Sequence, residues 1–266
     1  MIPKIIHYCW FGGKPLPESA ARCMASWKKI LPDYEIRVWN EETFDLNCCD
    51  YVREAAEADK WAFVSDYVRL YALVTCGGVY MDTDVEVIKP LDPFLDYRAF
   101  SGFQSDTEIP TGIMACEKGF KLFDKLLHDY DGRHFKLEDG TYNTQYTNVN
   151  AITDACVEKG LILNNTMQVI DGFALFPKDV FCAKDYSTRE VTVTENTVTI
   201  HHFAGSWVPL DARLETRIIE GCSSKRAGRV LSAPFRGIKK IRWRVEGSRR
   251  SGKLSRKNGR IKGKDI

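Results

Sequence analysis

The pattern of apolar and polar positions at the start of the chain predicts a strand, a helix and a second strand. Residues 3–9, PKIIHYC, form an apolar, β-branched run that leads into the turn-prone residues 10–13, WFGG. Residues 18–31 place apolar side chains at helical spacing between two prolines. Residues 34–40, YEIRVWN, alternate as a strand does. This order is the repeating unit of a parallel α/β sheet.

The middle of the chain predicts one long helix followed by a strand pair with a polar break. Residues 55–76 carry an apolar stripe that ends at Gly77-Gly78. Residues 79–91 are apolar except around the acidic turn Asp82-Thr83-Asp84. The later segments predict a strand at 98–103, helices at 118–130 and 150–160, strands within 167–177 and a hairpin at 190–203. The expected class is α/β, with a Rossmann-like, mostly parallel central sheet flanked by helices and a small C-terminal hairpin.

Composition favours a soluble globular protein with reduced thiols. Of the 266 residues, 44% are hydrophobic, which is enough to build a sizeable core. The nine cysteines are odd in number and lack a Cys-x-x-Cys pair, which argues against a disulfide framework or a structural zinc site. No apolar run reaches the roughly 18–20 residues of a membrane helix, and no signal-peptide core is seen. We therefore expect a cytoplasmic protein.

Charge divides the chain into an acidic body and a basic tail. Residues 222–266 contain 16 Lys/Arg and two acidic residues, about +14, so a net charge of +2 leaves about −12 for the rest. We expect a catalytic domain at 1–216 and a basic extension, partly helical or disordered, at 217–266. The tail, with its apolar and basic segment 235–245, is expected to dock on the anionic inner face of the cell membrane. A solvated extension remains the alternative, and nucleic acid is a less favoured partner because it would leave the acidic body unexplained.

Two groups of polar residues in the body are candidates for chemistry. Asp82 and Asp84 interrupt a strand pair, and such carboxylates suit Mg²⁺ or Mn²⁺ bridged to phosphate. Asp66 and Arg69 lie three residues apart on one helix face, where an ordinary ion pair is the alternative.

A third group follows the predicted hairpin. His201 and His202 precede a Gly-Ser-Trp turn that includes Ser206 and Trp207. There an imidazole and a hydroxyl could complete a metal site, and the indole could cover a ligand.

Together these residues resemble glycosyltransferase family 32, the transferases with a sugar-binding region that contains an Asp-x-Asp motif and that often serve surface polysaccharide (capsule) synthesis. The resemblance implies a GT-A fold, a nucleotide-diphosphate sugar donor, a divalent metal and retention of anomeric configuration. It covers most of residues 1–210 and rests on four ordered blocks at 2–13, 31–42, 58–92 and 200–207.

The resemblance also implies roles for particular residues in donor binding. Trp10 would stack on the nucleobase, and Asp66 and Arg69 would contact the sugar, ribose or phosphates. Asp82 would hold ribose or sugar hydroxyls. Asn148 would face the sugar or the acceptor.

Other residues would complete the metal site and its cover. Asp84 would ligate Mn²⁺ or Mg²⁺. His202, with His201 as the second candidate, would add a further ligand. Ser206 and Trp207 would close over the diphosphate, with Ser206 also offered to the metal.

The sequence thus predicts a hexosyltransferase that uses a UDP-sugar, or GDP-mannose, and a glycan or lipid-linked saccharide acceptor. Because no nucleophile stands out, front-face attack is favoured over a covalent intermediate. The alternatives are a metal-dependent nucleotide-sugar hydrolase or phosphotransferase, and a nucleic-acid-binding protein acting through the tail.

Overall fold

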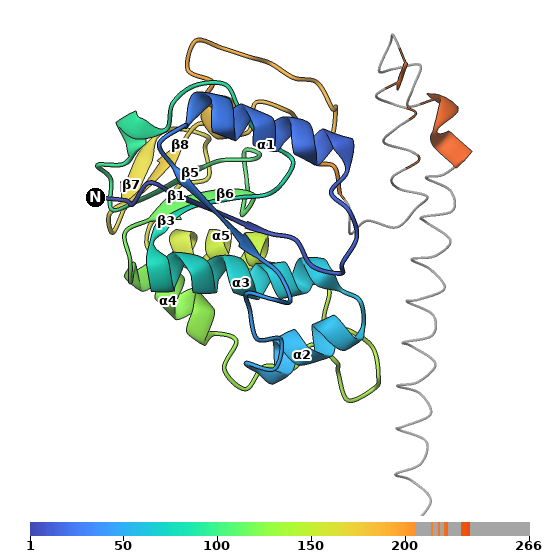
Figure 1. Cartoon of the computed structure of the whole chain (residues 1–266). Coiled ribbons are helices and arrows are strands. Elements are labelled where there is room, and N and C mark those ends of the chain that lie inside the picture. The colour runs from blue at the N-terminus through green and yellow to red at the C-terminus, as the bar shows by residue number, and fades with distance from the viewer. Residues whose placement is uncertain (206–213, 215–217, 219–220, 223–229, 235–266) are drawn as a thin grey trace, which may run out of the picture. The chain divides into compact units, whose positions relative to one another are not determined.

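The computed structural model describes residues 1–205, 214, 218, 221–222 and 230–234 (Figure 1). The chain forms two compact units, Met1–Ala204 and Gly205–Ile266. All elements named below belong to the first unit. Within the described ranges, no helix combines the length and the apolar character needed to traverse a lipid bilayer. The predicted boundary at residue 216 and most of the basic tail lie outside the described residues.

A seven-stranded sheet forms the centre of the first unit. Its order is β2-β1-β3-β6-β5-β8-β7, and five of these strands run in one direction while β6 and β7 run in the other. The mostly parallel α/β class is therefore confirmed. The bounds are β1 Ile5–Cys9, β2 Glu35–Trp39, β3 Gly78–Met81, β5 Ala99–Gly102, β6 Ile113–Cys116, β7 Gln168–Ile170 and β8 Phe173–Phe176.

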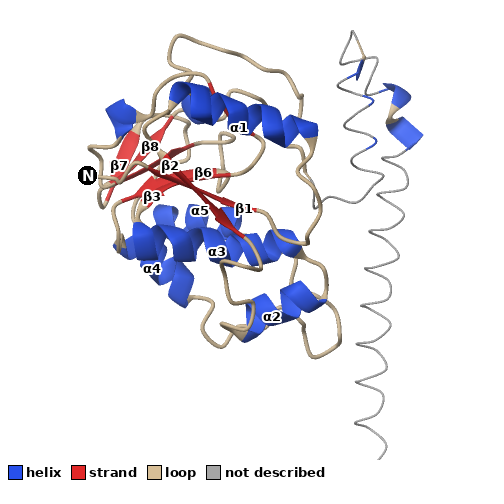
Figure 2. Ribbon diagram, in the orientation of Figure 1, coloured by secondary structure: helices blue, strands red, loops and turns tan. Residues whose placement is uncertain are grey.

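Helices cover both faces of this sheet, with α1 on one side and α3, α4 and α5 on the other (Figure 2). Two apolar clusters fill these layers, one containing Trp27 of α1 and the other containing Phe63 and Val68 of α3. Strands buried on both faces read as continuous apolar runs, which is why IIHYC could be identified from sequence. The helices are α1 Glu18–Ile30, α2 Asp50–Glu57, α3 Trp61–Cys76, α4 Lys121–His128, α5 Asn148–Glu158, the short α6 Lys178–Phe181 and the 3₁₀ turn Asp92–Phe94.

The long helix expected over 55–76 is wrong in its first part, because two helices occupy this region. α2 ends at Glu57, and Asp59 adopts a left-handed φ of 54° before α3 begins at Trp61. Asp tolerates this conformation better than most residues, so the apolar stripe continues while the helix axis breaks. The predicted end at Gly77 is confirmed, with a φ of 70°.

The hairpin expected at 190–203 is also wrong. Its second run forms β9, Thr199–His201, which pairs antiparallel with β4, Val85–Val87. Its first run makes only an isolated bridge between Val191 and Lys184. Val191 and Val193 remain 47% and 57% exposed, whereas all of β9 is buried. Burial against β4 thus decides the pairing in favour of a strand distant in sequence.

Candidate functional site

The acidic turn joins the large sheet to the small one. β3 ends at Met81 and β4 begins at Val85, whose N–H donates to the Asp82 carbonyl at 3.0 Å. The Asp82 N–H donates to the carbonyl of Gly112 at 2.8 Å. Both carboxylates of the turn therefore follow the carboxyl end of a central strand, where ligands of α/β sheets collect.

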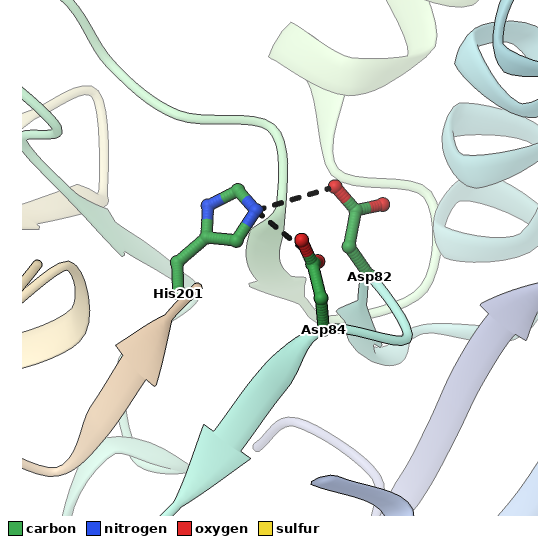
Figure 3. A group of neighbouring side chains, drawn as sticks. All are labelled: Asp82, Asp84 and His201. Carbon is green, nitrogen blue, oxygen red and sulfur yellow. Dashed lines mark ion pairs between the residues drawn. The ribbon is translucent and has the colours of Figure 1, made fainter. Parts of the chain in front are cut away.

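His201 completes a three-residue cluster with the two aspartates. It is the last residue of β9 and lies opposite Val85 in the strand register. Its Nε2 is 3.3 Å from Asp84 Oδ1 and 3.8 Å from Asp82 Oδ2 (Figure 3). One donor atom from each of the three residues lies within 4.8 Å of the others. Two carboxylates suit Mg²⁺ or Mn²⁺, whereas an imidazole is a more usual ligand of transition metals than of Mg²⁺.

The cluster is strongly polarised. Burial alone would raise the pKa of the Asp84 carboxyl, but the His201 imidazolium and the N–H of Ala204, 2.6 Å from Oδ2, bring that pKa below its ordinary value. Burial alone would lower the pKa of His201, but Asp84 raises it above the ordinary range. The proximity of Asp84 thus favours the protonated form of His201. A metal ion ligated by Nε2 would replace this proton.

Arg69 extends the cluster toward α3. Its Nη2 lies 3.1 Å from Asp66 Oδ1, and its Nη1 lies 3.6 Å from Asp82 Oδ1. Its guanidinium also sits over the ring of Tyr80, 4.8 Å from the ring centroid. Burial raises the pKa of Asp66 to about 6, with Arg69 opposing the shift and Asp82 adding to it. The spacing of Asp66 and Arg69 therefore marks a buried ion pair at the edge of the cluster.

Most N–H groups of Arg69 are already engaged by the protein. Nε donates to the Ser65 carbonyl at 3.2 Å, and Nη1 donates to the carbonyl and Oγ1 of Thr111 at 2.6 and 3.0 Å. The residue is 6% exposed. Arg69 is therefore better placed to hold the neighbouring carboxylates and supply a fixed positive charge than to bind phosphates directly, as the resemblance implied.

The side chains of two predicted residues have their hydrogen-bond partners outside the group of Asp82, Asp84 and His201. His202 turns to the opposite side of its strand, as neighbouring strand residues do, and its Nε2 lies 2.9 Å from Glu86 Oε2. Asn148 is buried at the start of α5, where it donates to the Asp66 carbonyl at 2.6 Å and accepts from the Tyr130 hydroxyl at 2.6 Å. The structure thus brings His201, rather than His202, to the aspartates and uses Asn148 to tie α5 to α3.

Among the described residues, Trp10 hydrogen-bonds elsewhere than to this network. Trp10 is half-buried after β1, and its Nε1 donates to the Lys14 carbonyl at 2.5 Å. Ser206 and Trp207 lie outside the described residues.

Three residues of the site were not anticipated. Tyr80 donates its hydroxyl to Asp82 Oδ1 at 2.9 Å. It stands two positions before Asp82, so the period of a strand could have placed it on the same side. Thr111 and Gly112 contact Arg69 and Asp82, but they come from a segment without a recognisable motif.

Several residues of the site lie in a segment that is similar to a known protein family. Residues 17–101, which include Asp66, Arg69, Asp82 and Asp84, match the family model described as "Glycosyltransferase sugar-binding region containing DXD motif". Over about a third of its length the chain is therefore similar to the sugar-binding region of this glycosyltransferase family. The predicted resemblance is confirmed on the part of the chain that holds both the acidic turn and the buried ion pair.

Proteins similar to this chain include two from fungi. The chain is 33% identical over 122 residues to "Inositol phosphoceramide mannosyltransferase 3" of Schizosaccharomyces pombe, covering 44% of this chain and 34% of the relative. It is 26% identical over 149 residues to "Mannosyl phosphorylinositol ceramide synthase CSH1" of Saccharomyces cerevisiae, covering 51% and 36%. The chain therefore spans about a third of the length of these relatives.

Among solved structures, "PaToxG Glycosyltransferase" aligns over 60% of this chain and 69% of its own, with 19% identity and a TM-score of 0.46.

Proposed function

We propose that this chain is a metal-dependent hexosyltransferase of the GT-A type that uses a nucleotide-diphosphate sugar as donor. The observation that supports this most is the convergence of Asp82, Asp84 and His201 beside Arg69, within and next to a glycosyltransferase sugar-binding region. Mn²⁺ is the favoured cation because it combines a preference for carboxylate oxygens with the ability of a transition metal to accept an imidazole.

The proposed chemistry concerns the bond between the sugar and the diphosphate. Asp82, Asp84 and His201 would hold the cation, and a bound divalent cation supplies Lewis-acid stabilisation of the leaving diphosphate. Arg69 adds a fixed positive charge behind Asp82 in a buried setting, where electrostatic effects are strong. Tyr80 holds one oxygen of Asp82 and thereby orients the other toward His201.

Retention by front-face attack is part of the proposal. In the described part of the site each carboxylate faces a cationic side chain: Asp66 faces Arg69, and Asp82 and Asp84 face His201. A carboxylate engaged in this way is a poor nucleophile, so a covalent sugar intermediate is disfavoured.

The relatives suggest where to look for donor and acceptor. Both are named for mannosyl transfer to an inositol phosphoceramide lipid. We therefore propose GDP-mannose beside UDP-sugars as donor candidates, and a glycan or lipid-linked saccharide as acceptor in surface polysaccharide synthesis. A cytoplasmic enzyme docked on the inner face of the membrane through its basic tail would meet such an acceptor.

The test is a turnover assay of the full chain with a panel of UDP- and GDP-sugars and Mn²⁺. Release of UDP or GDP that requires a saccharide acceptor, and that stops in excess chelator, is the expected result. Nucleotide release that is independent of acceptors would instead identify a nucleotide-sugar hydrolase. Turnover that persists in chelator would overturn the metal requirement.

A further inference from the structure

The dipeptide Thr111-Gly112 touches both charged centres of the site. Thr111 offers its carbonyl and its hydroxyl to Arg69 Nη1, at 2.6 and 3.0 Å. The next carbonyl, that of Gly112, accepts the N–H of Asp82 at 2.8 Å. Both residues are buried and lead directly into β6, which pairs with β3 through Met81 and Ile113. The dipeptide is therefore held by the central sheet while it contacts the acidic turn and the arginine.

Gly112 is needed for space and not for its backbone angles. It is not among the glycines with positive φ. A Cβ at this position would lie 2.5 Å from His201 Cε1, 2.8 Å from His201 Nδ1 and 3.0 Å from Asp82 Oδ2. Non-bonded carbon atoms normally stay about 3.5–4.0 Å apart. A side chain here would have to displace the imidazole, because the sheet holds the backbone of residue 112.

Thr111 controls the other side of the same cluster. Its two oxygen atoms occupy the N–H groups of Nη1, which is the Arg69 nitrogen 3.6 Å from Asp82 Oδ1. Without the Thr111 hydroxyl, one N–H of Arg69 Nη1 would lose its acceptor and could donate to Asp82 instead. Arg69 would then compete with a cation for that carboxylate.

We propose that Thr111-Gly112 is the positioning element of the cation site: the missing side chain of Gly112 lets His201 approach Asp82 and Asp84, and Thr111 keeps Arg69 from closing on Asp82. This inference rests on the proposed function, because it concerns the same cation site. It assigns a role to a segment outside the Asp-x-Asp motif.

The first experiment measures Mn²⁺ binding to the full chain by the electron paramagnetic resonance signal of free Mn²⁺. Gly112→Ala should lose about 10- to 100-fold in Mn²⁺ affinity, the range seen when groups that orient metal ligands are removed. Its melting temperature should fall only moderately, the usual effect of overpacking a buried site, because among the described residues the added methyl group meets only the side chains of His201 and Asp82 within 3.0 Å. Gly119→Ala is the control, because a Cβ there meets nothing within 4 Å and its φ of 71° carries the backbone strain that Gly112 lacks.

The outcomes separate this inference from the proposed function. Equal Mn²⁺ affinity of wild type and Gly112→Ala overturns the positioning role and leaves the metal-dependent transferase standing. A wild-type chain that binds no Mn²⁺ overturns both. Weakened binding in Gly112→Ala together with wild-type binding in Gly119→Ala supports the inference.

A second pair of variants decides the matter if Gly112→Ala does not fold. Thr111→Val removes the hydroxyl and keeps the shape, whereas Thr111→Ser keeps the hydroxyl. Mn²⁺ affinity should fall in Thr111→Val and stay at the wild-type level in Thr111→Ser. Equal affinities in these two variants would overturn the inference.

Discussion

The hydroxyl of Tyr80 donates to Oδ1 of Asp82 at 2.9 Å and leaves Oδ2 of the same carboxylate facing His201 at 3.8 Å. A buried strand residue thus decides which carboxylate oxygen is offered to a cation. Because Tyr80 is 1% exposed and its ring packs beneath the Arg69 guanidinium, this orientation is built into the core.

Tyr80→Phe should therefore weaken Mn²⁺ binding by about tenfold, the lower end for loss of a group that orients a metal ligand. The stability cost should be modest, about 0.5–1.5 kcal/mol, because water can reach the partly exposed Asp82. Mn²⁺ titration and urea unfolding measure the two effects. Tyr71→Phe, on the Trp39 and Phe44 side of α3, is the matched control. Unchanged Mn²⁺ affinity in Tyr80→Phe would show that Asp82 needs no such support.

Asp84→Asn should abolish metal-dependent turnover while the fold survives. The amide oxygen can still accept the Ala204 N–H, but the charge that attracts a cation and His201 is lost. We expect turnover to fall by about 100-fold or more, the scale of losing one electrostatic contact to a transition state. The measurement is turnover against Mn²⁺ concentration. Glu86→Gln, which removes the charge opposite His202, should behave as wild type. Full activity of Asp84→Asn would contradict the assignment.

Much of the fold followed from local pattern. α1 lies where Pro17 and the helical spacing placed it, and β1 and β2 coincide with the two apolar runs predicted around it. The break between α2 and α3 was missed because an apolar stripe can continue across a single left-handed residue such as Asp59. Period analysis records which residues face the core and not whether the helix axis is continuous.

The site was predictable where its residues follow one another in sequence. The i, i+3 spacing of Asp66 and Arg69 and the Asp-x-Asp turn are local signals, and the structure brings them together. The preference for His202 was not supported by its position, since only the register of β9 against β4 shows which histidine faces the aspartates. Gly112 matters because a side chain at this position would collide with His201. This contact depends on the folded structure, so no pattern of residue types in the sequence could reveal it.

The raised pKa of Asp66 predicts a pH-dependent stability difference in Asp66→Asn. Burial raises this pKa to about 6, above the ordinary value of 3.8, so between these values the folded wild type binds a proton that the unfolded chain has released. Asp66 therefore contributes most to the free energy of unfolding of the wild type at low pH, and this contribution is lost as the pH rises through about 6. The asparagine variant has no such loss.

Unfolding by urea in chelator at pH 4, 5, 6 and 7 measures this difference. The free energy of unfolding of Asp66→Asn should rise relative to that of wild type between pH 4 and pH 7, by an amount on the order of 2–3 kcal/mol. Asp154→Asn, on the exposed side of α5 where Asp154 accepts the Tyr146 hydroxyl, controls for loss of a carboxyl group. If the two proteins differ in free energy of unfolding by the same amount at all four pH values, Asp66 titrates as an exposed carboxyl does.

Trp27→Phe should destabilise the acidic turn as well as the core. Trp27 is fully buried, and its Nε1 donates to the carbonyl of Val85, the residue that follows Asp84. Phenylalanine fills much of the volume but leaves that carbonyl without its donor, at a cost of about 1–3 kcal/mol. Mn²⁺ affinity should fall in parallel. Stability and Mn²⁺ affinity that both equal wild type would show that α1 does not support the turn.

The last prediction concerns the basic tail, most of which lies outside the described residues. With 16 Lys/Arg against two acidic residues after Gly221, the tail should hold the enzyme on anionic membranes. Each basic residue near such a surface contributes about 1 kcal/mol, and the attraction decays within a Debye length. The full chain should therefore co-sediment with phosphatidylglycerol vesicles at low salt and be released at high salt, whereas a chain ending at Gly221 should not bind.

Turnover of a soluble saccharide acceptor should be nearly equal for the full chain and the chain ending at Gly221, because the proposed cation site lies within Met1–Ala204. Equal vesicle binding by both chains, or by neither, would show that the tail is not the docking element.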